Sequence, residues 1–366
     1  MRIVRVEAVP LRLPIKSTIS FATGKLAAME HVLVRIHTEG DIVGISEAPA
    51  RPMIYGESVN SIVTAIEQWF DPALRGLEHD SVEEAWERLD RVEGNVCAKA
   101  AIDIAMHDLI AKVAGQPLWR LIGGYSNEVE VCHGIFKLGP PEEIAAEAQE
   151  AVNRHGFRWL KLKAGVDPDR DTRLVAAVRK SVGDGVHITV DCNHGYASHV
   201  AEKVLPAWRD YGIDWVEEPS PGQDVHGRAR VAASAGIPLM LDESAQTPLA
   251  VYQEMQRGVC SVVSIKPARS GISQSRKILT LCELGGLRPV IGSQGDSEIG
   301  AFAAAQLGAS QRSIASTCAE VSFFLEMAES IVVERPLLRD GRLILPERPG
   351  IGVLVDEDAL ARCRMH

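Results

Sequence analysis

The chain has 366 residues, of which 46% are hydrophobic and 24% are charged, and its formal net charge is −10. This length and apolar content indicate a soluble globular protein of about two domains, or one large α/β barrel with an attached domain. The acidic balance argues against nucleic acid or a membrane surface as a partner, and seven cysteines without a CxxC pair favour a reducing cytoplasm.

Residues 1–125 predict an α+β domain. The chain starts with an alternating strand pattern and shows no signal-like or membrane-length apolar run. Residues 3–13 and 30–48 are typical of strands, with a hairpin around Glu39 and Gly40. A helical pattern follows over residues 98–115 and ends at a glycine.

Residues 126–325 have a different pattern, in which strand-like apolar runs alternate with helical ones. The runs are "GFRWLKLKA", "GVHITVDCN", "GIDWVEEP", "GIPLMLDES", "VCSVVSIKPA" and "LRPVIGSQ". Such alternation predicts βα units with parallel strands. Residues 326–366 return to hairpin chemistry, with Asp340-Gly341 as a turn, and we expect this tail to rejoin the first domain.

Charged residues end successive strands at regular intervals of 28, 26, 25, 24 and 30 residues. A βα unit takes about 30 residues, so these side chains would lie at matching heights on consecutive strands. In a TIM-like barrel the carboxyl ends of the strands form the active site. The residues at these positions are Lys163, Asp191, Glu217, Asp242, Lys266 and Asp296.

Three of these residues predict a metal site. Asp191, Glu217 and Asp242 offer hard oxygen ligands without histidine or cysteine, which favours Mg²⁺, with Mn²⁺ as a substitute. The alternative for each residue is a helix N-cap, a common place for aspartate after a strand. One such residue is often a cap, but three caps at these matching positions would be far less common, so the metal site is favoured.

The lysines predict an acid–base function. Lys161 and Lys163 share one face of their strand, and a neighbouring ammonium group with partial burial lowers a lysine pKa. We therefore expect Lys163 to act as a base and Lys161 to tune it and contact a substrate carboxylate. Lys266 would face Lys163 across the barrel opening. The alternative, an exposed amphipathic strand edge, does not suit so apolar a run.

Four further residues are candidates for supporting roles. Asn193 shares a face with Asp191 and would contact a lysine or the waters of the metal. Tyr55 lies in a Pro- and Gly-punctuated lid loop, where it either bonds the substrate or packs. His194 suits a surface or supporting role better than that of a ligand, and Glu243 would orient a catalytic lysine.

The motifs "LKLK", "VDCN", "VEEP", "LDES" and "SIKPA" resemble those of the enolase superfamily, in its muconate lactonizing enzyme subgroup. The resemblance implies a modified (β/α)7β TIM-like barrel with an α+β N-terminal capping domain. It also implies the lysine pair on the second strand, the metal acids on the third to fifth, and a lysine on the sixth. The subgroup's chemistry uses a lysine base and Mg²⁺ to stabilise an enolate.

The lid stretch, "SIKPARSGI" and "CAEVSFFLEM" are similar to muconate cycloisomerases of actinobacterial type. Asp296 occupies the place of a seventh-strand acid found in many members. Ser270-Gly271 replaces a Gly-Gly pair that is common in the subgroup. The resemblance therefore does not predict which substrate the loop after Lys266 selects. Mandelate-racemase-type chemistry needs a seventh-strand histidine, and residues 290–300 contain none.

The resemblance implies a Mg²⁺-dependent muconate cycloisomerase acting on a small carboxylate, and a homo-oligomer. Racemases or epimerases of N-acyl amino acids, dipeptides or proline-type substrates, acid dehydratases and a retired, non-catalytic barrel remain alternatives. A dipeptide epimerase needs an acid to hold the substrate's ammonium group, and three acids could do so. They are Asp296, Glu298 and Glu320.

The lid favours the cycloisomerase. Its loops bring cationic and apolar side chains and no acid, which suits an unsaturated dianion better than a zwitterion. These side chains are Lys25, Arg51, Phe21, Met53 and Ile54.

Overall fold

The N-terminal part of the chain forms an antiparallel sheet. The computed structural model describes residues 1–21 and 24–365, and the side chains of these residues except 20, 21 and 24–26. β1 (Ile3–Phe21), β2 (Gly24–Thr38) and β3 (Val43–Pro49) pair in that order. β2 and β3 are joined at Glu39 and Gly40, where the sequence predicts a turn.

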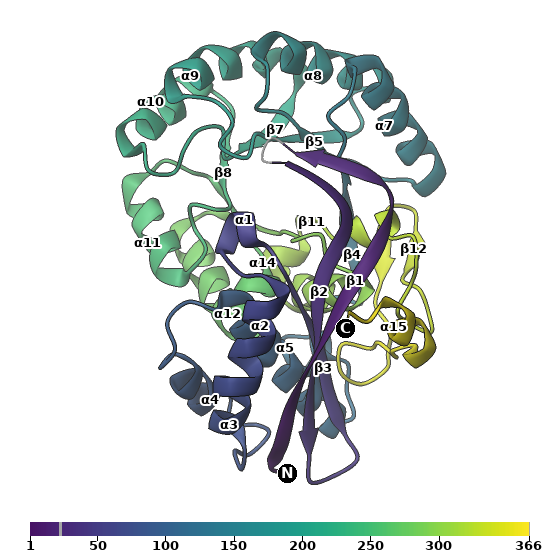
Figure 1. The fold of residues 1–366 in the computed structure, drawn as a ribbon. Coiled ribbons are helices and arrows are strands. Elements are labelled where there is room, and N and C mark those ends of the chain that lie inside the picture. The colour runs from purple at the N-terminus through teal and green to yellow at the C-terminus, as the bar shows by residue number, and fades with distance from the viewer. Residues whose placement is uncertain (22–23, 366) are drawn as a thin grey trace.

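Helices that follow β3 pack against this sheet (Figure 1). The longest, α5 (Val96–Val113), is almost wholly buried, and β3 approaches it closely at Gly44, where a Cβ would collide with the Ala105 carbonyl oxygen. The others are α1 (Pro52–Tyr55), α2 (Val59–Ala65), a π-helical turn (Ile66–Phe70), α3 (Asp71–Leu74), α4 (Val82–Leu89) and α6 (Leu118–Leu121).

Parallel strands β4 to β11 close into a barrel, because β11 pairs with both β10 and β4. A helix follows each of β4 to β10, so this part of the described chain is a (β/α)7β barrel, as expected. The strands are β4 (Glu128–Ile135), β5 (Trp159–Lys163), β6 (His187–Asp191), β7 (Ile213–Glu217), β8 (Leu239–Leu241), β9 (Val262–Ile265), β10 (Arg288–Ile291) and β11 (Cys318–Ala319).

The barrel helices begin and end where the sequence signals it. Asp167 caps α8 by accepting from the Arg170 amide at 2.6 Å, and Thr247 caps α11. None of the described helices is long and apolar enough to cross a membrane. The helices are α7 (Pro141–His155), α8 (Pro168–Val182), α9 (Ser198–Ala207), α10 (Val225–Ala235), α11 (Pro248–Arg257), α12 (Pro267–Gly285), α13 (Glu298–Ser310) and α14 (Arg312–Ala315).

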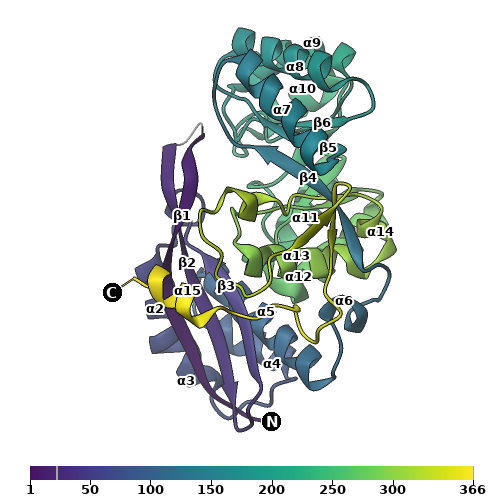
Figure 2. The ribbon, with the colours of Figure 1, turned by 90° about the vertical axis from the view of Figure 1, so that its right-hand side faces the viewer.

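The C-terminal tail contacts both domains in turn. Its hairpin, β12 (Leu337–Arg339) and β13 (Arg342–Ile344), pairs with the start of the barrel strand β4 and not with the capping sheet. The expected return to the capping domain occurs later, at α15 (Glu357–Cys363), which lies beside β1 (Figure 2). The tail therefore connects the two domains.

The free edge of β1 is covered by segments that are distant in the sequence. The Met365 amide donates to the Pro10 carbonyl at 2.9 Å, and the Ala328 amide donates to the Pro14 carbonyl at 2.8 Å. Both covering segments follow the last barrel strand, so β1 acquires these neighbours from the C-terminal part of the chain.

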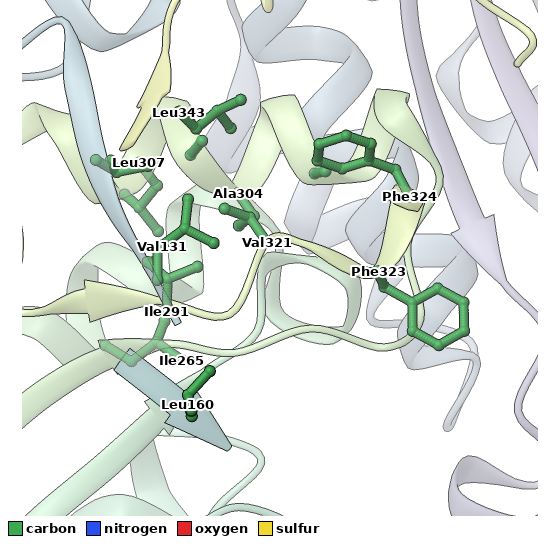
Figure 3. Close-up of a cluster of buried hydrophobic side chains, with 14 of the residues drawn as sticks. Val131, Leu160, Ile265, Ile291, Ala304, Leu307, Val321, Phe323, Phe324 and Leu343 are labelled. Atoms are coloured by element: carbon green, nitrogen blue, oxygen red, sulfur yellow. The ribbon is translucent and has the colours of Figure 1, made fainter. Parts of the chain in front are cut away.

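One continuous hydrophobic core spans the barrel and part of the capping domain. Figure 3 shows Val131, Leu160, Ile265 and Ile291 from four barrel strands beside Leu307 of α13. The same cluster of buried side chains includes members from β1 and β2. Burying a side chain of this size contributes about 1.5–3 kcal/mol, so the shared core couples the two domains energetically.

Candidate active site

The charged residues at the strand ends gather at one end of the barrel. Parallel pairing aligns Lys163 with Asp191 and Asp191 with Glu217 on adjacent strands. Asp242 follows β8 directly and Lys266 follows β9. The regular sequence spacing thus corresponds to a ring of charged side chains.

Lys161 lies at the centre of three carboxylates. Its ammonium group is 2.6 Å from Glu217 Oε2, 2.9 Å from Glu320 Oε2 and 3.2 Å from Asp191 Oδ2. The side chain is 7% exposed. It is fully engaged by protein carboxylates in this arrangement, and reaching a substrate carboxylate would require one of them to be exchanged.

Asp191 separates the two lysines of β5. Its Oδ2 lies 2.6 Å from Lys163 Nζ and 3.2 Å from Lys161 Nζ, so one carboxylate oxygen bridges both ammonium groups. Asn193 Oδ1 accepts a second hydrogen bond from Lys163 at 2.9 Å. The repulsion expected between two cations on one strand face is offset by this bridge.

Asp242 is held by two cations on the opposite side of the ring. Lys266 Nζ contacts Oδ2, and Arg269 Nη1 lies 2.7 Å from Oδ1. Arg269 Nη2 also donates to the main-chain carbonyls of Asp242 and Ser264, at 3.0 and 3.2 Å. Arg269 therefore fixes both the side chain and the backbone of this strand end.

The carboxylates of the ring raise the pKa values of two of its lysines, Lys161 and Lys266. Burial lowers the pKa of Lys161, but Glu217, Glu320 and Asp191 outweigh it and raise the pKa well above its usual value. Burial likewise lowers the pKa of Lys266, and Asp242 reverses the effect. The carboxylates that contact Lys161 and Lys266 therefore favour the charged forms of both lysines.

Tyr55 connects the lid to this ring. It ends α1, and its hydroxyl accepts from Arg269 Nη1 at 3.1 Å and contacts Gln294 Nε2. Burial raises the pKa of Tyr55 to about 12, although Arg269 and Lys266 oppose this. The side chain is not part of the cavity wall in this arrangement, and the substrate contact expected from the sequence stays a prediction.

Asp296 does not point at the cavity either. Its Oδ2 accepts from Ser293 Oγ at 2.7 Å and from the Gln294 amide at 3.2 Å. Burial and the nearby Glu47 raise its pKa. Asp296 and Glu298 are both buried outside the cavity wall, and the substrate-binding role expected for Asp296 stays a prediction.

A cavity of about 780 Å³ opens above the ring. Lys161, Lys163, Asp191 and Lys266 line its charged part, and Glu320 joins them. The lid contributes Arg51, Met53 and Ile54, the apolar pair being 78% and 40% exposed. The side chains of Phe21 and Lys25, which the sequence also assigns to the lid, lie outside the described residues. The lining combines lysine ammonium groups with an apolar cover.

Two family descriptions together cover nearly the whole chain. Residues 2–123 match the mandelate racemase/muconate lactonizing enzyme N-terminal domain, and residues 143–359 match the enolase C-terminal domain-like family. The chain belongs to the enolase superfamily. Within the superfamily it falls in the muconate lactonizing enzyme subgroup, and it is an isomerase.

Relatives in the enolase superfamily carry several activities. The chain is 31% identical to the L-Ala-D/L-Glu epimerase of Bacillus subtilis, over 97% of both sequences. It is 30% identical to muconate cycloisomerase 1 of Rhodococcus opacus, over 98% of both. A solved muconate lactonizing enzyme of Mycobacterium smegmatis, complexed with muconolactone, is 35% identical with a TM-score of 0.97 over the whole of each chain.

Enzymes of the enolase superfamily typically use Mg²⁺, and the chemistry of Asp191, Glu217 and Asp242 fits that ion. Glu217 Oε1 is buried without a hydrogen-bond partner, and burial with Asp191 raises the pKa of Glu217 well above its usual value. A cation would relieve both effects. In the described residues the ligand atoms of these three acids do not all lie within 4.8 Å, so binding requires lysine contacts to open.

Two residues of this superfamily site, Arg269 and Gln294, are not among those predicted from the sequence. Arg269 carries a clear signal, since it follows Lys266 by three residues on the same strand-to-helix turn. Gln294 carries none, because its contact with Tyr55 joins residues that are 239 positions apart.

Proposed function

We propose that the protein is a Mg²⁺-dependent cycloisomerase that acts on a small unsaturated dicarboxylate of the cis,cis-muconate type. The observation that carries the proposal is the position of the acids after the seventh and eighth strands. Asp296 and Glu298 are buried away from the cavity, and Glu320 is paired with Lys161. None of the three is available to hold the free ammonium group of a dipeptide.

The charge balance of the ring supports a dianionic substrate. Its ion pairs join four carboxylates to four cationic groups, so the protein charges cancel before any divalent ion enters. A divalent cation adds two positive charges, which a dicarboxylate neutralises and a zwitterionic dipeptide does not. The carboxylates are Asp191, Glu217, Asp242 and Glu320, and the cations are Lys161, Lys163, Lys266 and Arg269.

The proposed reaction conserves all atoms of the substrate. One carboxylate oxygen bonds to an alkene carbon of the same molecule, and the displaced electron pair is taken up as an enolate next to the other carboxylate. Bound Mg²⁺ would stabilise the charge on that carboxylate. Lys163 or Lys266 then transfers a proton from Nζ to the α-carbon and regains one from solvent. The apolar lid limits access of water.

N-acyl amino acid racemisation is the second candidate. It is favoured by the placement of Lys163 and Lys266 on strands separated by half the barrel, each paired with a different carboxylate. A racemase needs two proton carriers on opposite faces of one carbon, and an N-acyl substrate has no ammonium group to hold. The cavity of about 780 Å³ has room for such a substrate.

Ultraviolet absorbance and deuterium incorporation test these proposals together. With Mg²⁺ present, we expect the absorbance of cis,cis-muconate to disappear, and in D₂O the lactone should carry one deuterium on a single face of its α-carbon. Chelation should abolish turnover, and Mg²⁺ or Mn²⁺ should restore it. Untouched muconate, with α-proton exchange of an N-acyl amino acid or proline-type substrate, would overturn the cycloisomerase in favour of the racemase.

A further inference from the structure

A group of three metal-ligating side chains lies beside the ring and takes no part in the proposed reaction. From His194, Glu218 and Glu243, one potential ligand atom each can be chosen so that all lie within 4.8 Å of one another. They follow β6, β7 and β8 on three neighbouring loops. We propose that they form a second cation site, at the rim of the cavity, for a divalent transition metal such as Zn²⁺ or Co²⁺.

Unsatisfied oxygen atoms point into this group. Glu218 is 1% exposed, and its Oε2 is buried without a hydrogen-bond partner. Its other oxygen is satisfied by the amides of Asp242 and Ser244, at 2.8 and 2.9 Å. Glu243 Oε2 is also buried and unpartnered. A buried carboxylate oxygen without a donor is costly, so a positive charge between the two carboxylates would be stabilising.

The histidine is oriented as a metal ligand usually is. His194 Nδ1 lies 3.0 Å from the Ser220 carbonyl oxygen, which can only accept, so this nitrogen carries the proton. In the neutral ring, Nε2 then presents its lone pair, 3.6 Å from Glu243 Oε2. A ligating histidine commonly donates its other N–H to a carbonyl in this way. Either a proton on Nε2 or a metal ion between the two atoms would remove the repulsion of their lone pairs.

The spacing is close to that of a ligand shell. Nitrogen and oxygen ligands about 2.1 Å from a metal lie about 3.0–3.4 Å from one another. His194 Nε2, the nitrogen with the free lone pair, lies 3.6 Å from Glu243 Oε2. The histidine is 28% exposed, so water from the cavity can complete the coordination. An imidazole nitrogen with two carboxylates favours Zn²⁺ or Co²⁺ over Mg²⁺.

The neighbouring arginine does not fill the site. Arg228 Nη2 lies 3.8 Å from Glu218 Oε2, beyond hydrogen-bond distance. It donates instead to Ser244 Oγ at 3.0 Å, and Nη1 pairs with Glu254 at 3.1 Å. The guanidinium is therefore hydrogen-bonded to one side of the site, and it shares Glu254 with Arg257.

The proposed site is connected to the catalytic lysine. Glu243 Oε1 accepts from Asn193 Nδ2 at 3.2 Å, and Asn193 Oδ1 accepts from Lys163 at 2.9 Å. A metal on Glu243 would fix this carboxylate and, through Asn193, the position of Lys163. The inference does not depend on which substrate the barrel converts.

The test uses tag-free protein with saturating Mg²⁺, to which Co²⁺ is added. Calorimetry should give one Co²⁺ per chain, and anomalous diffraction should place it between His194, Glu218 and Glu243. In His194→Gln the rim signal should be lost, with affinity weakened at least ~10-fold, the range for loss of a metal-binding group. Asp191→Asn is the matched control, in which the rim signal should persist.

Other outcomes would overturn the inference. They are an anomalous peak confined to Asp191, Glu217 and Asp242, or Co²⁺ binding that His194→Gln leaves unchanged. Absence of Co²⁺ from the rim would assign the positive charge there to a protonated His194. If His194→Gln does not fold, Glu243→Gln gives the same test. Loss of muconate turnover alone would bear on the proposed function and not on this site.

Discussion

At the scale of single residues, Asp191 decides how two lysines coexist on one strand face. One of its oxygens accepts a hydrogen bond from Lys163 and forms an ion pair with Lys161, so the lysine pair is electrostatically stable before substrate arrives. The same carboxylate is a predicted metal ligand. A metal that took this oxygen would leave the two lysines facing each other, and their mutual repulsion would then favour loss of a proton.

Removing either catalytic lysine should affect turnover far more than folding. We expect Lys163→Ala and Lys266→Ala each to lower kcat by at least ~10²-fold, because each loses a group that transfers a proton. Lys277→Ala, on the exposed side of α12, is the control and should keep the parental rate. Steady-state kinetics measure this, on cis,cis-muconate or on the N-acyl amino acid if that substrate exchanges its α-proton. A near-parental rate in either variant contradicts the role of that lysine in proton transfer.

The sequence predicts which residues end the strands, but not which of them pair. Regular spacing brings Asp191, Glu217 and Asp242 to one ring, since the βα repeat fixes their height. The pairing of Lys161 with Glu320, and of Asp242 with Arg269, depends on side-chain reach across the barrel. That reach has no counterpart in sequence spacing, which is why the sequence does not predict these ion pairs.

At the scale of elements, the lid helix α1 is tied to the barrel through Tyr55. Tyr55→Phe removes the hydroxyl that contacts Arg269 and Gln294. Two lost hydrogen bonds of about 1 kcal/mol each should raise KM about 30-fold, with little change in kcat, because the lid closes less well. The control is Tyr252→Phe, since this ring is 46% exposed on α11. A fall in kcat at unchanged KM would mean that Tyr55 acts on the chemistry.

A second link joins β3 of the capping sheet to the start of α13. Glu47 accepts from the Ser297 amide at 2.8 Å and lies 3.2 Å from His31 Nδ1. Burial raises the pKa of Glu47, but His31 and Ser297 outweigh it and hold the pKa below its usual value. A lowered carboxyl pKa stabilises the fold above the unfolded-state pKa of 4.5, and this contribution is lost as the pH falls through the folded-state pKa.

We therefore expect a pH-dependent effect of Glu47→Gln. At pH 7 the variant should lose about 1–3 kcal/mol in the free energy of unfolding, because charged hydrogen bonds between the domains are broken. The difference should shrink below pH 4.5, where the parental carboxylate becomes protonated. Urea unfolding across this range measures it, with the exposed Glu67→Gln as control. A difference that is constant with pH would exclude the ionised carboxylate as its source.

Element prediction succeeds where a local pattern is sufficient. The turn at Asp340 and Gly341 is found between β12 and β13, with φ of 49° and 76°. The partner of this hairpin is β4, which lies about 200 residues earlier and which no local pattern specifies. The sequence therefore predicts the hairpin but not the strand with which it pairs.

At the scale of the whole molecule, the shared core predicts one cooperative unfolding transition. Leu360 of α15 is 5% exposed within this core. Leu360→Ala should lower the free energy of unfolding by about 2–4 kcal/mol and should do so equally for probes of both domains. Leu354→Ala, at a 47% exposed position, is the control. Amide hydrogen exchange that rises in the capping domain alone would show that the domains unfold separately.

The cover on the edge of β1 has a consequence for biosynthesis. Arg364 pairs with Leu11, and these residues are 353 positions apart (364 − 11). At about 5–20 residues per second, a ribosome adds Arg364 roughly 20–70 s after it has added Leu11. During that interval the part of nascent β1 around Leu11 lacks its native partner on this edge. Pro10 and Pro14 lie on it, and because proline lacks an amide hydrogen, they hinder pairing with other emerging chains until the native cover arrives.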